Sequence, residues 1–127
     1  MAARITTEAG RAALAAVLAV LAVVDDDDPA PSRPELLTAV RWTLGLLAEA
    51  HPGRSVEVRV PPAGAVQVIE GPRHTRGTPA NVVEMDPRTW LELATGRLTW
   101  AEADAAGRIH ASGTRADLSD YLPLGQI

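Results

Sequence analysis

The sequence predicts an α+β fold built as one domain. Helical patterning fills the first fifty residues, apolar and polar residues alternate from about residue 55, and capped helices return after residue 86. A chain of 127 residues matches the size of a single domain and suffices for one hydrophobic core. The expected order of elements is α-α-β-β-β-α-α-β-α.

The first predicted helix lies within residues 1–24. Its apolar run, residues 12–24, is too short to span a bilayer. A signal peptide is the alternative, because Arg4 and Arg11 precede the run. Glu8 lies within that basic region and no convincing small-residue cleavage site follows, so we expect a helix that packs on the domain.

Residues 25–34 read as an acidic, proline-rich linker, and residues 35–127 as the core of the domain. A second helix is expected over residues 35–50, because five apolar residues share one helical face. These are Leu36, Leu37, Val40, Leu44 and Leu47. Trp42 lies beside this stripe. It either widens the core face or faces a tunnel mouth or a partner subunit.

Four segments have the alternation of half-buried strands, namely residues 55–60, 65–70, 81–85 and 108–112. The first two are separated by a Pro-Pro-Ala-Gly turn and therefore predict a hairpin. Residues 71–79 have the composition of a loop.

Two short helices are predicted between the third and fourth strands. Asp86, followed by proline, caps the first, and Gly96 ends it. Thr99 and Glu102 form a capping box for the second. Residues 116–122 are expected to form a last helical turn or a short helix.

The composition supplies few residue types that could carry out catalysis. The net charge is −4, which disfavours a nucleic-acid binder. There is no cysteine, and all twelve basic residues are arginine, so thiolate, lysine and Walker-type chemistry are excluded. His51, His74 and His110 are too dispersed for a local metal site. We expect no catalytic residue, metal or cofactor, and therefore no enzyme.

Two remaining groups of polar residues have both a functional and a structural interpretation. Arg73, His74 and Arg76 could bind an anionic head group, or they belong to a solvated loop. His110 with the acids and serine of residues 117–120 could form a hydrolytic triad. No nucleophile-elbow pattern supports that triad.

Residues 82–122 carry a family resemblance. A strand, Asp86, an apolar helix, Thr-Gly, a small helix and Gly-Arg-Ile follow one another as in the C-terminal half of sterol carrier protein-like domains. Residues 56–84 resemble a bacterial sterol carrier protein orthologue group typical of actinobacteria. The resemblance covers residues 35–124. It implies a roughly five-stranded sheet covered on one side by helices, here with an extra N-terminal helix pair.

The resemblance also implies a function. In this family an apolar tunnel between sheet and helices often holds a lipid or fatty acyl chain. We therefore expect a cytoplasmic, non-enzymatic binding protein for an apolar ligand, with its cavity between the sheet and residues 86–107, at the Gly96–Thr99 junction. The candidate ligand-binding residues are Trp42, Met85, Trp90, Leu98, Trp100 and Tyr121. Each aromatic among them could instead fill the core.

An interaction or accessory module is the alternative function. Its cavity would be filled by side chains, and its helix pair would form a homodimer or dock a partner enzyme. A fold alone does not choose between these functions.

Overall fold

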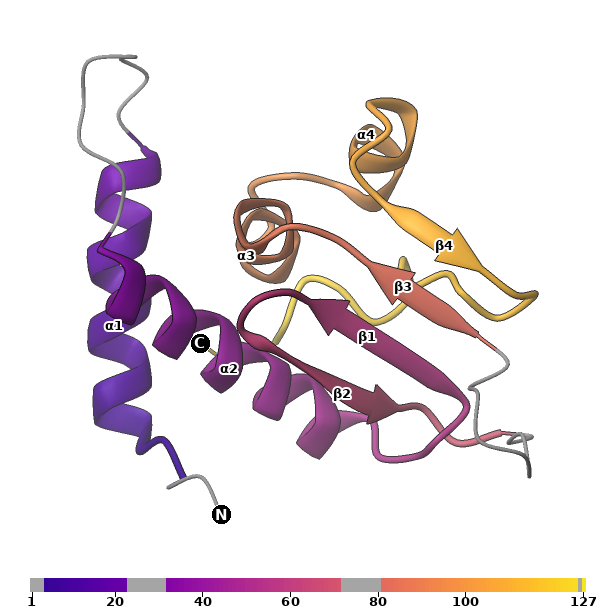
Figure 1. The fold of residues 1–127 in the computed structure, drawn as a ribbon, viewed down its shortest axis with the longest axis horizontal. Coiled ribbons are helices and arrows are strands. Elements are labelled where there is room, and N and C mark those ends of the chain that lie inside the picture. The colour runs from indigo at the N-terminus through magenta and orange to yellow at the C-terminus, as the bar shows by residue number, and fades with distance from the viewer. Residues whose placement is uncertain (1–3, 23–31, 72–80, 126) are drawn as a thin grey trace.

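A computed structural model describes residues 4–22, 32–71, 81–125 and 127. Within this part of the chain the fold is α+β, with four helices and one four-stranded sheet (Figure 1). The α+β class predicted from the sequence is thereby confirmed. A fifth strand is not among the described residues.

The four helices begin at polar caps, as their sequences require. Their bounds are α1 (Thr7–Leu21), α2 (Arg33–Ala50), α3 (Pro87–Thr95) and α4 (Trp100–Ala105). The side chains of Thr6, Ser32, Asp86 and Thr99 each accept a backbone N–H of the first turn. Because Ser32 caps α2, that helix begins two residues earlier than the linker composition predicted.

The sheet has the strand order β2-β1-β3-β4. Its strands are β1 (Val56–Val60), β2 (Gly64–Val68), β3 (Val82–Glu84) and β4 (His110–Ser112). β1 and β2 form the predicted antiparallel hairpin, β3 runs parallel to β1, and β4 is antiparallel to β3. β2 ends at Val68 because Ile69 takes a φ of 68°, outside the extended region.

The core lies between the sheet and the helices α2 and α3. Val56, Val58 and Val60 of β1 are fully buried, whereas the intervening Glu57 and Arg59 form an ion pair on the opposite face. In Figure 1 the helix α2 passes behind β2, and both α3 and β2 contact it.

In the chain after β4, residues 116–122, for which a last helical turn or a short helix was predicted, form no helix but contain one turn, in which the N–H of Tyr121 donates to the carbonyl of Leu118. This C-terminal tail is held by its own contacts. Leu118 is fully buried, and the rings of Tyr121 and His51 meet in a T-shaped arrangement at a centroid distance of 4.7 Å. The backbone N–H of Leu124 donates to the carbonyl of Ala94 at the end of α3. The tail therefore ends beside α3, where it approaches α1.

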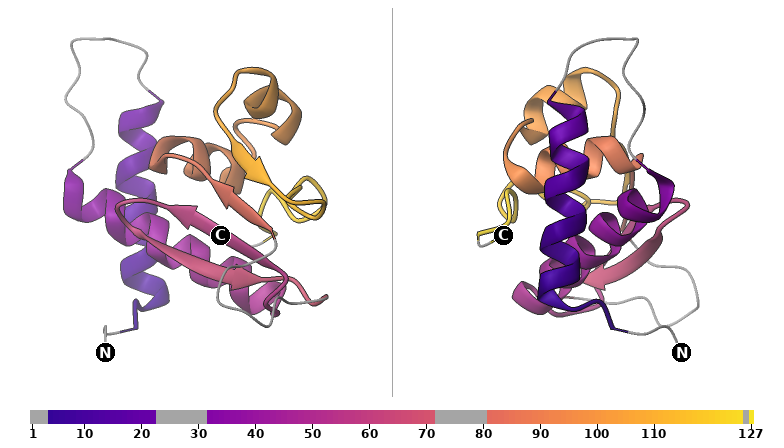
Figure 2. Two further views of the ribbon diagram at one scale, coloured as in Figure 1. Left: turned by 45° about the vertical axis from the view of Figure 1, so that its right-hand side comes forward. Right: turned by 90° about the vertical axis from the view of Figure 1, so that its left-hand side faces the viewer.

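Helix α1 packs across α2, as the two views in Figure 2 show from different sides. Ala13, Leu14 and Val17 are buried in this contact. Gly10 allows the close approach: a Cβ at this position would lie 2.2 Å from the indole of Trp42. Trp42 is thus covered by α1 and is only 7% exposed.

Candidate functional site

The six residues predicted to bind an apolar ligand lie in different surroundings. Trp90 and Met85 are buried in the core, and the indole Nε1 of Trp90 donates to the hydroxyl of Thr43 at 2.8 Å. Trp42 lies under α1, and Tyr121 meets His51. The remaining two, Leu98 and Trp100, are half-buried against the core. None of the six lines the pocket described below.

The space between the sheet and α3 is closely packed at its centre. Trp90, Leu91 and Val58 are each 0% exposed, so no water-sized void adjoins their side chains. The other predicted group, Arg73, His74 and Arg76, lies outside the described residues.

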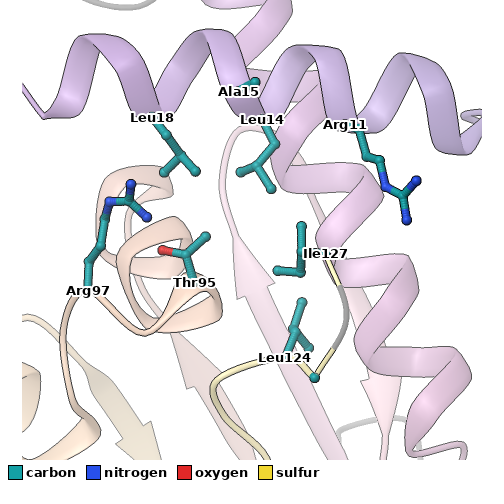
Figure 3. Close-up of a pocket in the computed structure, with 9 residues that line it drawn as sticks. Arg11, Leu14, Ala15, Leu18, Thr95, Arg97, Leu124 and Ile127 are labelled. Atoms are coloured by element: carbon teal, nitrogen blue, oxygen red, sulfur yellow. The ribbon is translucent and has the colours of Figure 1, made fainter.

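A pocket of about 500 Å³ lies beneath α1 (Figure 3). Three segments that are distant in the sequence form its walls: one side of α1, the end of α3, and the C-terminal tail. Its lining residues are Arg11, Leu14, Ala15, Leu18, Thr95, Arg97, Leu124, Gly125 and Ile127. We call it the α1 pocket.

The apolar part of the α1 pocket comes from α1 and the tail. Leu14 and Leu18 are one helical turn apart, so both point from α1 into the pocket. Leu124 and Ile127 point toward them from the tail (Figure 3). The hydrogen bond between Leu124 and Ala94 fixes the tail at this wall.

The end of α3 places polar residues at the border of the α1 pocket. Gly96 takes a left-handed conformation with φ 82°, which ends α3 and turns the chain so that Arg97 borders the pocket. Arg97 and Arg11 lie at opposite ends of the pocket in Figure 3. Within the described segments neither arginine forms an ion pair. Thr95 donates its hydroxyl proton to the carbonyl of Leu91, so its oxygen can still accept a hydrogen bond.

The cavity predicted from the sequence, between the sheet and residues 86–107, does not coincide with this pocket. The predicted junction Gly96–Thr99 borders it through Arg97, but the other walls are α1 and the tail. Arg11, Leu14 and Leu18 were not predicted to bind a ligand. Their spacing of three and four residues is a usable signal, because it places one charge and two leucines on the same side of α1.

Asp117, one of the acids in the hydrolytic triad considered from the sequence, has a structural role. The backbone N–H of Ser119 donates to Asp117, and this hydrogen bond holds the pKa of the Asp117 carboxyl below its ordinary value. A lower pKa makes the carboxylate a weaker base, so Asp117 stabilises a turn. In the part of the chain that the structure describes, no three His, Asp or Glu side chains are grouped to hold a metal ion.

The family model described as a bacterial SCP ortholog, where SCP denotes sterol carrier protein, matches residues 32–124. The chain belongs to this family. The match begins at the N-cap of α2 and ends in the tail, so it includes α2 and leaves α1 outside. The wall that α1 contributes to the pocket therefore lies outside the family match.

Two further findings concern the chain as a whole. No curated protein matches this sterol carrier protein-like chain. Among the helices in the described segments, none combines the length and the apolarity needed to cross a membrane.

Proposed function

We propose that this protein is a non-enzymatic carrier that binds an apolar chain bearing an anionic head group in the α1 pocket. The pocket itself carries the proposal: four large apolar side chains line it, with an arginine at each end. Its volume of about 500 Å³ is within the range of small-molecule sites. Membership of the sterol carrier protein-like family supports a carrier role.

The energetics favour a ligand of this shape. Each methylene that leaves water contributes about 0.8 kcal/mol, before the cost of association. Arg97 or Arg11 would hold a carboxylate by paired, charge-assisted hydrogen bonds. We therefore expect dodecanoate to bind with a micromolar Kd.

Filling the pocket should abolish this binding. Ala15 is exposed on α1 and lines the pocket, so Ala15→Trp adds bulk there without enlarging a buried residue. We expect at least a tenfold weaker Kd for dodecanoate in calorimetry. Ala12→Trp is the matched control, because Ala12 is exposed on the same helix and does not line the pocket. Equal binding by the two variants would contradict the proposal.

The head-group contact makes a separate prediction. Arg97→Gln should weaken dodecanoate binding three- to tenfold and leave dodecanol binding unchanged, because only the acid needs the guanidinium. Arg54→Gln removes an exposed arginine elsewhere and should change neither Kd. A loss of affinity for dodecanol by Arg97→Gln would indicate a distorted pocket instead of a lost charge contact.

Self-association is a second candidate function. Away from the pocket, α1 exposes Ala12 and Ala19, and the helix has no polar side chain after Arg11. If self-association through α1 is the function, light scattering should report a concentration-dependent dimer that Ala12→Glu disrupts. A monomer at every concentration would leave the carrier role as the remaining candidate.

A further inference from the structure

A second cavity, of about 610 Å³, lies where the chain enters α1 and crosses α2. Residues 4–7 form one wall. Two rows of α2, each with four-residue spacing, form the other, namely Arg41, Gly45 and Glu49 beside Trp42 and Leu46. We call it the α1/α2 groove. It shares no lining residue with the α1 pocket.

Trp42 brings a hydrogen-bond donor to this groove. The residue is only 7% exposed, and Gly10 lies over its pyrrole ring. No described residue accepts a hydrogen bond from its indole Nε1. Among the described residues no buried side-chain nitrogen or oxygen lacks a partner, so this N–H is accessible at the surface. Trp42 lines the groove, and among the described residues its indole N–H has no protein acceptor.

The charges of the groove favour an anion. Arg4 and Glu49 form an ion pair at 2.8 Å and neutralise each other. Arg41 donates from Nε to the carbonyl of Ala63 at 2.7 Å, which fixes the side chain and leaves its terminal Nη groups for another partner. Within the described residues Arg41 forms no ion pair. The groove thus carries one uncompensated positive charge beside the indole donor.

The remaining wall of the groove is apolar and open. Ile5 and Leu46 are partly buried against the core and line the groove. Gly45 also lines the groove, and a Cβ on Gly45 would meet no atom within 4 Å. A flat apolar group therefore has room above Gly45, with the donors of Trp42 and Arg41 at its edge.

We propose that the α1/α2 groove is a second ligand site, for a small organic carboxylate with an apolar ring or chain. The carboxylate accepts from Arg41 and from the indole N–H of Trp42, and the apolar body covers Gly45 and Leu46. This site does not depend on the α1 pocket being occupied.

Indole N–H signals provide a direct test in the full-length protein. The chain has three tryptophans, so a ¹⁵N-labelled sample gives one indole signal from each. Titration with 4-phenylbutyrate should shift the Trp42 signal saturably. The Trp90 signal should stay in place, because its N–H is bound to Thr43 in the core.

The neutral 4-phenylbutyramide, which keeps the ring and loses the charge, should bind at least tenfold more weakly. Trp42→Phe assigns the signal.

A variant that fills the groove completes the test. Gly45→Leu should remove the Trp42 shift and should not lower Tm, because the added side chain meets open space and glycine is a poor helix former. Ala50→Leu, an exposed change on the same helix, should leave binding intact. An unmoved Trp42 signal in the wild type, or equal binding by Gly45→Leu, would overturn the proposal. Neither outcome affects dodecanoate binding in the α1 pocket, so the two proposals fail separately.

Discussion

Trp90→Ala is expected to lower the free energy of unfolding by about 3–5 kcal/mol, a large fraction of the stability of a typical small domain, which is about 5–15 kcal/mol. Trp90 is 0% exposed and lies at the centre of the packed layer between sheet and helices. Removing the indole leaves a cavity that the surrounding valines and leucines cannot close without strain. Urea denaturation followed by circular dichroism measures the change.

Trp90→Phe separates packing from hydrogen bonding. The phenyl ring refills most of the space, and the hydroxyl of Thr43 still donates to the carbonyl of Ala39 or Val40. We therefore expect this variant to lose about 1–2 kcal/mol, as for a lost buried hydrogen bond with modest underpacking. If Trp90→Ala cost no more than Trp90→Phe, the core around Trp90 would not be packed as described.

Two helical glycines should respond in opposite directions to the same change. Gly45→Ala is expected to stabilise the protein by about 1 kcal/mol, the ordinary gain from alanine in a helix. Gly10→Ala is expected to destabilise it by about 1–3 kcal/mol, because the new Cβ would lie 2.2 Å from the indole of Trp42. The indole is buried and cannot move aside, so α1 must lift from α2.

Gly10→Ala should weaken ligand binding as well as lower the stability of the protein. Leu14 and Leu18 move with α1, so Gly10→Ala should also weaken dodecanoate binding in the α1 pocket. Urea denaturation and calorimetry of the two alanine variants, measured side by side, check both effects. Stabilisation by Gly10→Ala would mean that α1 does not pack closely on Trp42.

Local signals in the sequence predicted most of the elements. The caps Asp86 and Thr99 and the stop at Gly96 act through bonds within a few residues, so their sequence neighbourhood determines them. For residues 116–122 the short helix was wrong, whereas the alternative of a single turn agrees with the hydrogen bond from the N–H of Tyr121 to the carbonyl of Leu118. The rest of the tail is held by long-range contacts such as the hydrogen bond from Leu124 to Ala94. Such contacts leave no periodic pattern in the sequence.

None of the six residues predicted to bind a ligand lines the α1 pocket, and of the predicted junction Gly96–Thr99 only Arg97 borders it. The gap after Gly96 could be expected from two helices that are capped and stopped separately. The sequence predicted that α1 packs on the domain but not where, since its position depends on Gly10 meeting a residue more than thirty positions away. Trp90 and Met85 were candidates for ligand contact because large apolar residues occur both in cores and in pockets. The structure shows that both are buried in the core.

Helix α1 is a shared wall of the α1 pocket and, through the residues that lead into it, of the α1/α2 groove. A ligand in either cavity therefore binds only the form in which α1 is docked. By thermodynamic linkage each ligand would stabilise that form by RT ln(1 + [L]/Kd) and would raise the affinity of the other cavity by the same coupling. The segment that lies outside the family match is thus placed to couple two binding events while the core beneath it keeps its packing.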